Sequence, residues 1–302
     1  MSKLVTGVYA AVLTLRHSDG TLDENGLAGL LGFLSSKGLD GFAFNGATGE
    51  FYLTTPAELE RILAVARDVL GNSTPWLCGV GSAGLAGCVE LGAIAARHGA
   101  RGLLLPMPYF FPYEQSDLEA FCREATRQLP LPSLLYNLPQ FTTGLAPETS
   151  IRLIAECHEI VGIKDSSGSL DTLRMLTRDG LEYCRIVGHD GVLVPALTEG
   201  ICDGVISGVA GVLPELVQSI FDKVAEFDSP QALGAIEALD EFVAQIGGMP
   251  TPWGLKWIAE SRGIARATFA QPLSGERIAQ GERLKQWFQM LYSDANIRAL
   301  RG

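Results

Sequence analysis

Short apolar runs alternate along most of the chain with longer segments that have helical periodicity. The short runs predict eight strands, at Gly7–Leu13, Gly41–Asn45, Trp76–Val80, Gly102–Leu105, Ser133–Tyr136, Ile160–Lys164, Arg185–Val187 and Gly204–Ile206. The longer segments predict amphipathic helices, at Glu24–Lys37, Pro56–Leu70, Leu85–His98, Gln115–Gln128, Pro147–Glu156, Leu170–Thr177, Val192–Glu199 and Pro214–Phe227. The chain is therefore expected to repeat one βα unit eight times.

Eight βα units whose strands are apolar on both faces predict an α/β fold, a parallel (β/α)8 TIM barrel with helices outside. A doubly wound parallel sheet is the alternative. Beyond the eighth unit the pattern predicts three further helices, Gln231–Ile246, Gly254–Ser261 and Gly275–Tyr292. We therefore expect a barrel domain over residues 1–228 and a C-terminal helical extension over residues 229–302, with no linker between them.

Composition limits the classes of function. The 302 residues include 47% hydrophobic and 19% charged residues, as is typical of a compact globular protein. A net charge of -11 and a pI near 4.9 argue against nucleic acid or an anionic membrane as a partner, because the average surface would repel both. No apolar stretch approaches the roughly 20 residues that span a bilayer, and no signal-peptide cleavage site is convincing. Six cysteines scattered without CxxC spacing predict reduced thiols and a cytoplasmic protein.

Lys164 stands out because it closes an apolar strand. The other five lysines lie in polar, helical or terminal segments, where a solvated ammonium needs no explanation. Apolar surroundings disfavour the charged form, so Lys164 is a candidate for a neutral amine that attacks a carbonyl and forms a Schiff base. The competing interpretation is a structural lysine paired with a carboxylate.

The carboxyl ends of the strands would surround one mouth of a barrel, where the chemistry of this fold gathers. Tyr136 ends the fifth predicted strand and would lie beside Lys164, as a proton carrier for Schiff-base chemistry. The turn at 46–50 offers backbone N–H groups suited to a small carboxylate, although it could equally be only a tight strand-to-helix turn. Gly188 follows the seventh strand at the same mouth and is counted among the substrate-binding candidates.

Four motifs in order resemble the dihydrodipicolinate synthase and N-acetylneuraminate lyase family of pyruvate-type Schiff-base aldolases: GATGE at 46–50, YNLP at 136–139, GIKDSSG at 162–168 and GVIS at 204–207. The resemblance covers most of the chain. It implies a (β/α)8 barrel in which Lys164 forms the imine to a 2-keto acid, with no other cofactor. It also implies Tyr136 as proton relay, Thr48 as a further catalytic residue that holds the carboxylate with Ala47, and Ile206 as lining of the pyruvate pocket. Family members are often homotetramers built as dimers of dimers, which is the assembly expected here.

Three positions depart from the synthase of lysine biosynthesis in this family. Ala47 stands where that synthase usually carries a threonine, so its hydroxyl relay is broken. Phe110 matches a relay tyrosine supplied by a neighbouring subunit, although Tyr109 or Tyr113 could replace it. Phe141 replaces an arginine that binds the carboxylate of aspartate semialdehyde, and a phenyl ring removes both that charge and its donors.

These losses leave Lys164, Tyr136 and Thr48 in place. We therefore expect a class I carbon–carbon lyase that cleaves or forms a 4-hydroxy-2-keto acid, with pyruvate as product or donor and a neutral or bulky aldehyde as the second partner. A 2-keto-3-deoxy sugar acid fits, as does an aromatic acceptor near Phe51, Phe110 and Phe141, although these rings could also be simple barrel-mouth packing. The alternatives are 4-hydroxy-tetrahydrodipicolinate synthase itself and a keto-acid dehydratase of the same family.

Other classes of function have weaker signals. The run Gly79–Gly84 matches the G-x-G-x-x-G of dinucleotide sites, but the next strand ends in Pro106–Pro108 without an acid for the ribose. The four histidines are dispersed and only His189 falls at a strand end, so no metal site is indicated. A catalytically silent keto-acid sensor would use the same pocket, and failure to trap an imine would support it.

Overall fold

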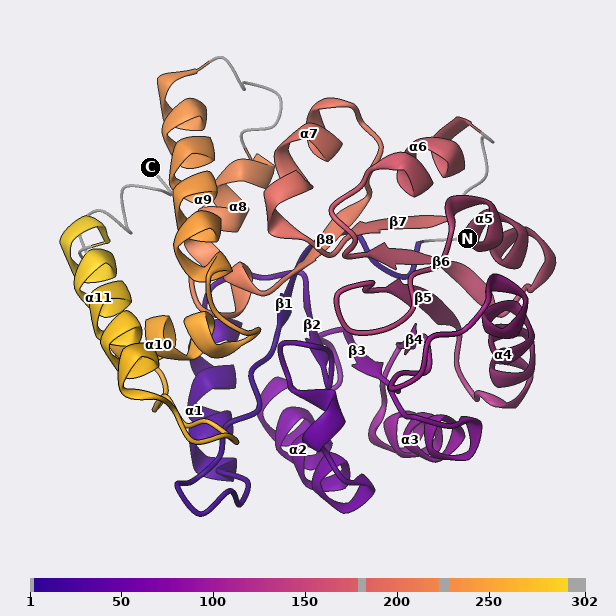
Figure 1. The fold of residues 1–302 in the computed structure, drawn as a ribbon, viewed down its shortest axis with the longest axis horizontal. Helices are drawn as coiled ribbons and strands as arrows, with labels where there is room; N and C mark the ends of the chain where they lie inside the picture. The colour runs from indigo at the N-terminus through magenta and orange to yellow at the C-terminus, as the bar shows by residue number, and fades with distance from the viewer. Residues whose placement is uncertain (1–2, 179–182, 223–228, 293–302) are drawn as a thin grey trace.

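The protein forms a closed barrel of eight parallel strands, seen in a computed structural model that describes residues 3–178, 183–222 and 229–292 (Figure 1). The strands are β1 (Gly7–Ala11), β2 (Gly41–Phe44), β3 (Trp76–Gly79), β4 (Gly102–Pro106), β5 (Ser133–Asn137), β6 (Ile160–Asp165), β7 (Cys184–Val187) and β8 (Gly204–Ser207). They are ordered as in the sequence, and β8 pairs with β1. The predicted TIM barrel is confirmed, and the doubly wound alternative is wrong because the sheet has closed on itself.

Helices surround the barrel, and their starts carry local signals. They are α1 (Glu24–Ser35), α2 (Pro56–Leu70), α3 (Leu85–His98), α4 (Gln115–Gln128), α5 (Pro147–Glu156), α6 (Asp171–Arg178), α7 (Leu193–Thr198) and α8 (Pro214–Asp222), with 3-10 turns η1 (Phe51–Leu53), η2 (Asp190–Val192) and η3 (Val209–Gly211). Asp23 accepts a hydrogen bond from the Gly26 N–H at the start of α1, and Thr55 forms a capping box with Glu58 at the start of α2. The predicted end of the eighth helix, Phe227, lies outside the described residues.

The C-terminal extension consists of α9 (Pro230–Gly247), α10 (Trp253–Ser261) and α11 (Gly275–Leu291), which stand on one side of the barrel with α9 against α8 (Figure 1). Its buried residues, among them Phe242 and Leu284, belong to the same continuous core as the outer faces of the strands. The prediction that every lysine other than Lys164 is solvated is wrong for Lys256, which α10 buries to 2% exposure. The predicted domain boundary adjoins residues 223–228, which lie outside the described chain.

A second, smaller set of buried side chains fills the inside of the barrel, including Val5, Tyr9, Leu104, Leu134 and Ile186. The barrel is therefore a packed core, and space for a ligand is left at the ends of the strands. None of the described helices is long and apolar enough to cross a membrane.

Candidate active site

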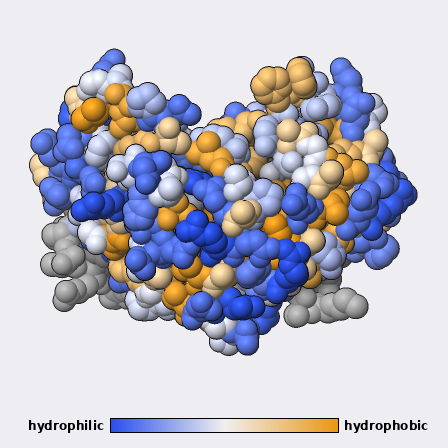
Figure 2. All heavy atoms as spheres, turned by 90° about the horizontal axis from the view of Figure 1, so that it is seen from below, coloured by the Kyte–Doolittle hydropathy of each residue, from blue (hydrophilic) through white to orange (hydrophobic). Residues whose placement is uncertain are grey.

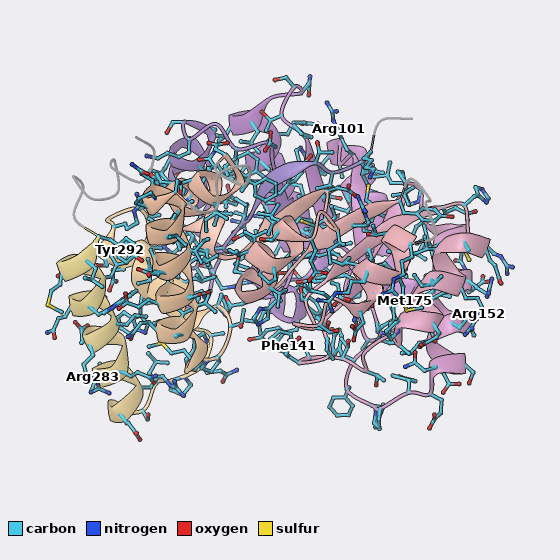
Figure 3. All side chains as sticks on the ribbon, turned by 90° about the horizontal axis from the view of Figure 1, so that it is seen from above. Arg101, Phe141, Arg152, Met175, Arg283 and Tyr292 are labelled. Carbon is cyan, nitrogen blue, oxygen red and sulfur yellow. The ribbon has the colours of Figure 1, made fainter. Side chains whose placement is uncertain are left out.

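A cavity of about 330 Å³ opens at the carboxyl ends of the strands, and Lys164 and Tyr136 both line it. The space-filling view shows the molecule hollowed between two raised lobes (Figure 2). Seen with its side chains, Phe141 lies at the base of this hollow, between the C-terminal helices on one side and loops on the other (Figure 3). The site is therefore at the predicted end of the barrel.

Lys164 and Tyr136 lie side by side because β5 and β6 pair in register, with Tyr136 opposite Lys164. Each residue is only 3% exposed, and Lys164 Nζ is 4.2 Å from the centre of the Tyr136 ring. Among the described residues, no carboxylate lies within ion-pairing distance of Lys164 Nζ. The described residues thus hold this amine in no ion pair, and Asp190 acts on it only through a longer-range charge interaction. This favours the catalytic interpretation over the structural one.

The turn at 46–50 passes directly beside this pair. A Cβ atom on Gly46 would stand 3.8 Å from the Tyr136 hydroxyl. The Glu50 N–H closes the turn on the Ala47 carbonyl at 3.0 Å, whereas the N–H groups of Ala47 and Thr48 have no acceptor within the described protein. Ala47 and Thr48 both line the cavity. Two N–H groups without an acceptor, on residues that line the same cavity as an amine, are suited to the carboxylate of a 2-keto acid.

Ile206 and Gly188, two of the predicted substrate-binding residues, also line the cavity. Gly188 is required for packing, because a Cβ atom there would lie 2.1 Å from Ser166 Oγ and 2.9 Å from Lys164 Cε. A side chain at this position must therefore displace the lysine stem.

The predicted role of Lys164 as the imine-forming amine implies that Gly188→Ala lowers kcat/KM roughly 100-fold, because a small displacement of the amine would spoil its alignment with a substrate ketone. Steady-state kinetics measure the effect. The matched control is Gly29→Ala in α1, where the added Cβ would meet nothing within 4 Å, and it should behave as wild type. Unaltered kinetics in Gly188→Ala would contradict the close packing of Lys164 against β7.

Two of the phenylalanines predicted to lie near the acceptor are placed differently. Phe141 lines the cavity and is 49% exposed at its rim. Phe110 does not line the cavity of its own chain: its side chain is 84% exposed and packs edge-on against Phe111, and its backbone has a left-handed φ of 90°. Neither Tyr109 nor Tyr113 lines the cavity in the described chain. Within one chain, no second tyrosine therefore joins Tyr136.

Five polar residues of the cavity were not identified as site residues in the sequence analysis: Gln140, Ser166, His189, Asp190 and Thr251. Ser166, His189 and Asp190 follow the ends of β6 and β7 and line the cavity with Lys164. Ser166 Oγ and Asp190 Oδ1 are buried with no hydrogen-bond partner in the described protein. Burial raises the pKa of the Asp190 carboxyl, and a hydrogen bond with Ser207 opposes this shift. Ser166, His189 and Asp190 could have been predicted from the sequence, because they closely follow the ends of strands.

The extension supplies a wall that the sequence analysis also missed. Val243 and Ile246 of α9, Met249 and Pro250 of the following loop, and Leu255 of α10 all line the cavity. These side chains are apolar, whereas Ser166, His189 and Asp190 on the strand-end side are polar. A substrate therefore meets one polar and one apolar surface.

The competing types of site find no support in the geometry. No group of three side chains that could ligate a metal occurs in the described part of the chain. Two glycines of the G-x-G-x-x-G run serve packing, since a Cβ atom on Gly79 would lie 2.1 Å from the Asn45 carbonyl oxygen and one on Gly81 would lie 2.4 Å from the Phe51 ring, whereas one on Gly84 would meet nothing within 4 Å. Gly79 and Gly81 allow close approach of the neighbouring loop.

A buried amine beside a phenol at the mouth of a (β/α)8 barrel defines the class I aldolases, which act through a lysine imine. Comparison with known proteins agrees, because the sequence profile of the Dihydrodipicolinate synthetase family matches residues 4–288. The chain belongs to this family, and it is a lyase of the class I aldolase type. The predicted resemblance is confirmed.

Individual relatives cover nearly the whole chain. It is 33% identical over 269 residues to 4-hydroxy-tetrahydrodipicolinate synthase 1 of Streptomyces coelicolor, covering 87% of this chain and 86% of the relative. It is 30% identical over 277 residues to the probable 2-dehydro-3-deoxy-D-pentonate aldolase of Escherichia coli, covering 89% and 91%. Dihydrodipicolinate synthase from Aquifex aeolicus has the same fold, with a TM-score of 0.87 at 24% identity over 95% of this chain and 98% of that one. The sialic acid aldolase of Ruminococcus gnavus also has this fold, with a TM-score of 0.83 at 19% identity over 94% of this chain and 97% of that one.

Proposed function

We propose that the protein cleaves, or in reverse forms, a 4-hydroxy-2-keto acid through an imine on Lys164, with pyruvate as the product or donor. The observation that carries this proposal is the buried pair of Lys164 and Tyr136, whose amine has no carboxylate partner in the described chain. The covalent imine replaces any further cofactor, because it accepts the electron pair of the breaking bond.

The proposed reaction follows from the positions of these groups. The Lys164 amine adds to the C2 ketone and water leaves, which gives a protonated imine. Tyr136 accepts the proton of the C4 hydroxyl as the C3–C4 bond breaks, and the bonding electrons form an enamine. The aldehyde departs, C3 is protonated, and hydrolysis frees pyruvate and the lysine. The Ala47 and Thr48 N–H groups and the Thr48 hydroxyl hold the carboxylate throughout, with Ile206 against the pyruvate methyl.

We infer that the second partner is a neutral, hydroxylated aldehyde, so that the substrate is a 2-keto-3-deoxy sugar acid. The unpartnered Ser166 Oγ and Asp190 Oδ1 offer hydrogen bonds to its hydroxyls. No arginine is present among the cavity residues of the described chain, and Phe141 stands at the rim, so an anionic aldehyde lacks a guanidinium partner. The Escherichia coli relative is named as an aldolase for a substrate of this class.

The test compares substrates on the wild-type chain. Pyruvate release from 2-keto-3-deoxy pentonate and hexonate isomers is measured beside condensation of pyruvate with aspartate semialdehyde. We expect kcat/KM for a sugar acid to exceed that for aspartate semialdehyde by roughly 100-fold or more, since a site rejects a partner whose charge it leaves unpaired. Preference for aspartate semialdehyde would instead indicate 4-hydroxy-tetrahydrodipicolinate synthase. Loss of water without release of an aldehyde would indicate a dehydratase, and either result would contradict the proposal.

Asp190→Asn is expected to lower activity and raise stability. The loss in kcat/KM should be about tenfold greater for substrates with hydroxyls beyond C4 than for the shortest 4-hydroxy-2-keto acid, as one charge-assisted hydrogen bond is lost. Because burial raises the pKa of Asp190 above its ordinary 3.8, the folded protein binds this proton more tightly than the unfolded chain. The ionised carboxylate therefore destabilises the fold above that raised pKa.

Thermal unfolding as a function of pH measures the second effect. The asparagine variant should be more stable than wild type at neutral pH, and the difference should shrink as the pH falls through the raised pKa towards 3.8. A variant that is less stable at neutral pH, or that discriminates no differently among substrates, would show that Asp190 has a purely structural role.

We also propose that the chain assembles into a homotetramer, a dimer of dimers, and acts in the cytoplasm. Phe110 and Phe111, which are 84% and 63% exposed after β4, support an interface, because a monomer would leave this aromatic pair in water. The six free cysteines fit a reducing compartment. Sedimentation of the full chain should give four times the 32.3 kDa of one chain, and a monomer would contradict the assembly.

A further inference from the structure

A buried ion pair joins the C-terminal extension to the turn that carries Ala47 and Thr48. Lys256 of α10 is 2% exposed and Glu50 is 1% exposed, and Lys256 Nζ donates to Glu50 Oε2 at 2.5 Å. The same ammonium donates to the Thr268 carbonyl oxygen at 2.8 Å. Two residues that are 206 positions apart in the sequence are thus fixed to each other inside the protein.

This pair is not explained by stability alone. Burial lowers the pKa of Lys256, and the adjacent Glu50 carboxylate opposes that shift. Taking two charges out of water carries a desolvation penalty that the attraction between them often does no more than offset. A well-packed apolar pair would stabilise this contact as well. A buried ion pair therefore suggests a role in fixing one particular geometry.

Glu50 is under backbone constraint. It has a left-handed φ of 54°, and Asn45 at the other end of the same turn has a φ of 53°. Residues other than glycine hold this conformation only when their surroundings determine it. The Asn45 side chain donates to the Gly79 carbonyl at 2.8 Å, and the Glu50 side chain accepts from Lys256. The turn that carries Ala47 is therefore held at its start by the barrel. At its end it is held twice, by the Thr14 hydroxyl, which donates to the Gly49 carbonyl at 2.7 Å, and by Lys256 of the extension.

The same part of α10 also reaches the substrate cavity. Leu255, the neighbour of Lys256, lines the cavity. A Cβ atom on Gly208 would lie 3.0 Å from Leu255 Cδ1 and 3.4 Å from Thr48 Oγ1, so Leu255 and Thr48 converge on one point of the wall. Two consecutive residues of α10 thus contact the cavity and the end of the turn.

We propose that Glu50 and Lys256 are positioning residues, through which the C-terminal extension holds the 46–50 turn in the shape that binds the keto-acid carboxylate. The inference rests on the proposed carboxylate-binding role of Ala47 and Thr48. It makes the extension a part of the pyruvate site rather than an appendage to the barrel. Neither residue takes part in the bond chemistry, so their loss affects pyruvate binding before it affects the imine-forming step.

The test uses Glu50→Gln and Lys256→Met in the full chain. Borohydride trapping of the imine is measured as a function of pyruvate concentration, which gives a half-saturating concentration and a limiting rate. We expect the half-saturating concentration to rise about tenfold in each variant, the effect of losing one hydrogen bond to a carboxylate. The limiting rate should change much less. The double variant leaves no unpaired buried charge, so it is expected to fold, and it should show the same rise.

The matched control is Arg262→Met. Arg262 follows α10 and pairs with Glu215 of α8, with Nη1 3.1 Å from Oε2, and this pair is also buried between extension and barrel. It does not contact the 46–50 turn, so its loss should reduce thermal stability and leave the half-saturating concentration unchanged. Equal effects of Arg262→Met and Lys256→Met on pyruvate binding, or no effect of the Glu50 and Lys256 variants, would overturn the inference. A wild-type chain that traps no pyruvate would overturn the proposed function and this inference with it.

Discussion

Replacement of Lys164 by methionine is expected to lower kcat by at least ~10,000-fold, since the imine that accepts the electrons of the breaking bond cannot form. Methionine retains an unbranched apolar stem of similar length. No ion pair is lost, because Lys164 has no carboxylate partner among the described residues. The fold should therefore be at least as stable as wild type. Pyruvate release and thermal unfolding together measure the two effects.

Lys256→Met is the matched control, since Lys256 is the other lysine found buried in the described chain. Its substitution leaves the Glu50 carboxylate buried without its partner, so stability should fall while the imine on Lys164 still forms. The two substitutions are thus expected to have opposite effects on stability and on imine formation. A Lys164→Met variant that retains most of its activity, or that loses stability as Lys256→Met does, would show that Lys164 is structural.

Tyr136→Phe is expected to lower kcat for cleavage by about 100-fold to 10,000-fold, the range for removal of a positioned acid–base group. The ring that packs 4.2 Å from Lys164 Nζ is retained, so the amine keeps its place. Borohydride trapping with pyruvate should therefore still label the variant, because the proton of the C4 hydroxyl is not involved. Cleavage at the wild-type rate in Tyr136→Phe would assign the proton transfer to another group.

The sequence predicts the barrel well because parallel strands buried on both faces leave short apolar runs. The ends of those runs predict the ends of the strands less well. The first run continues to Leu13, whereas β1 ends at Ala11: Val12 and Leu13 are buried at 3% and 1% exposure, but they are no longer part of the strand. An apolar run therefore predicts which residues are buried, but it does not predict which of them pair in a strand.

The positions of the candidate catalytic residues could be predicted where they depend on strand ends alone. Lys164 and Tyr136 each lie one residue before the end of adjacent paired strands, so the register places them side by side. Lys256 was misinterpreted because it lies on a helix, although its neighbours Leu255 and Trp257 are apolar and could have indicated burial. The apolar wall from α9 and α10 could not be predicted, since it depends on where the extension packs against the mouth of the barrel.

Phe110 shows a second limit on what can be predicted from the sequence of one chain. The sequence places it near the acceptor, but it does not line the cavity of its own chain and is 84% exposed. In the tetramer proposed above, a second copy would complete this position, and the sequence of one chain does not place that copy. Phe141 lines the cavity of its own chain. Phe141 therefore disfavours an anionic acceptor in a way that does not depend on a second subunit.

The most direct test of the account is borohydride reduction of the full chain with pyruvate, followed by peptide mass analysis. The account predicts one stable adduct, on the peptide that contains Lys164, and no adduct on the same peptide in Lys164→Met. The other buried lysine, Lys256, serves as an internal control within the same digest and should stay unmodified, because Glu50 holds its ammonium. An unmodified wild-type chain, or an adduct on a different lysine, would contradict the assignment of Lys164 as the imine-forming residue.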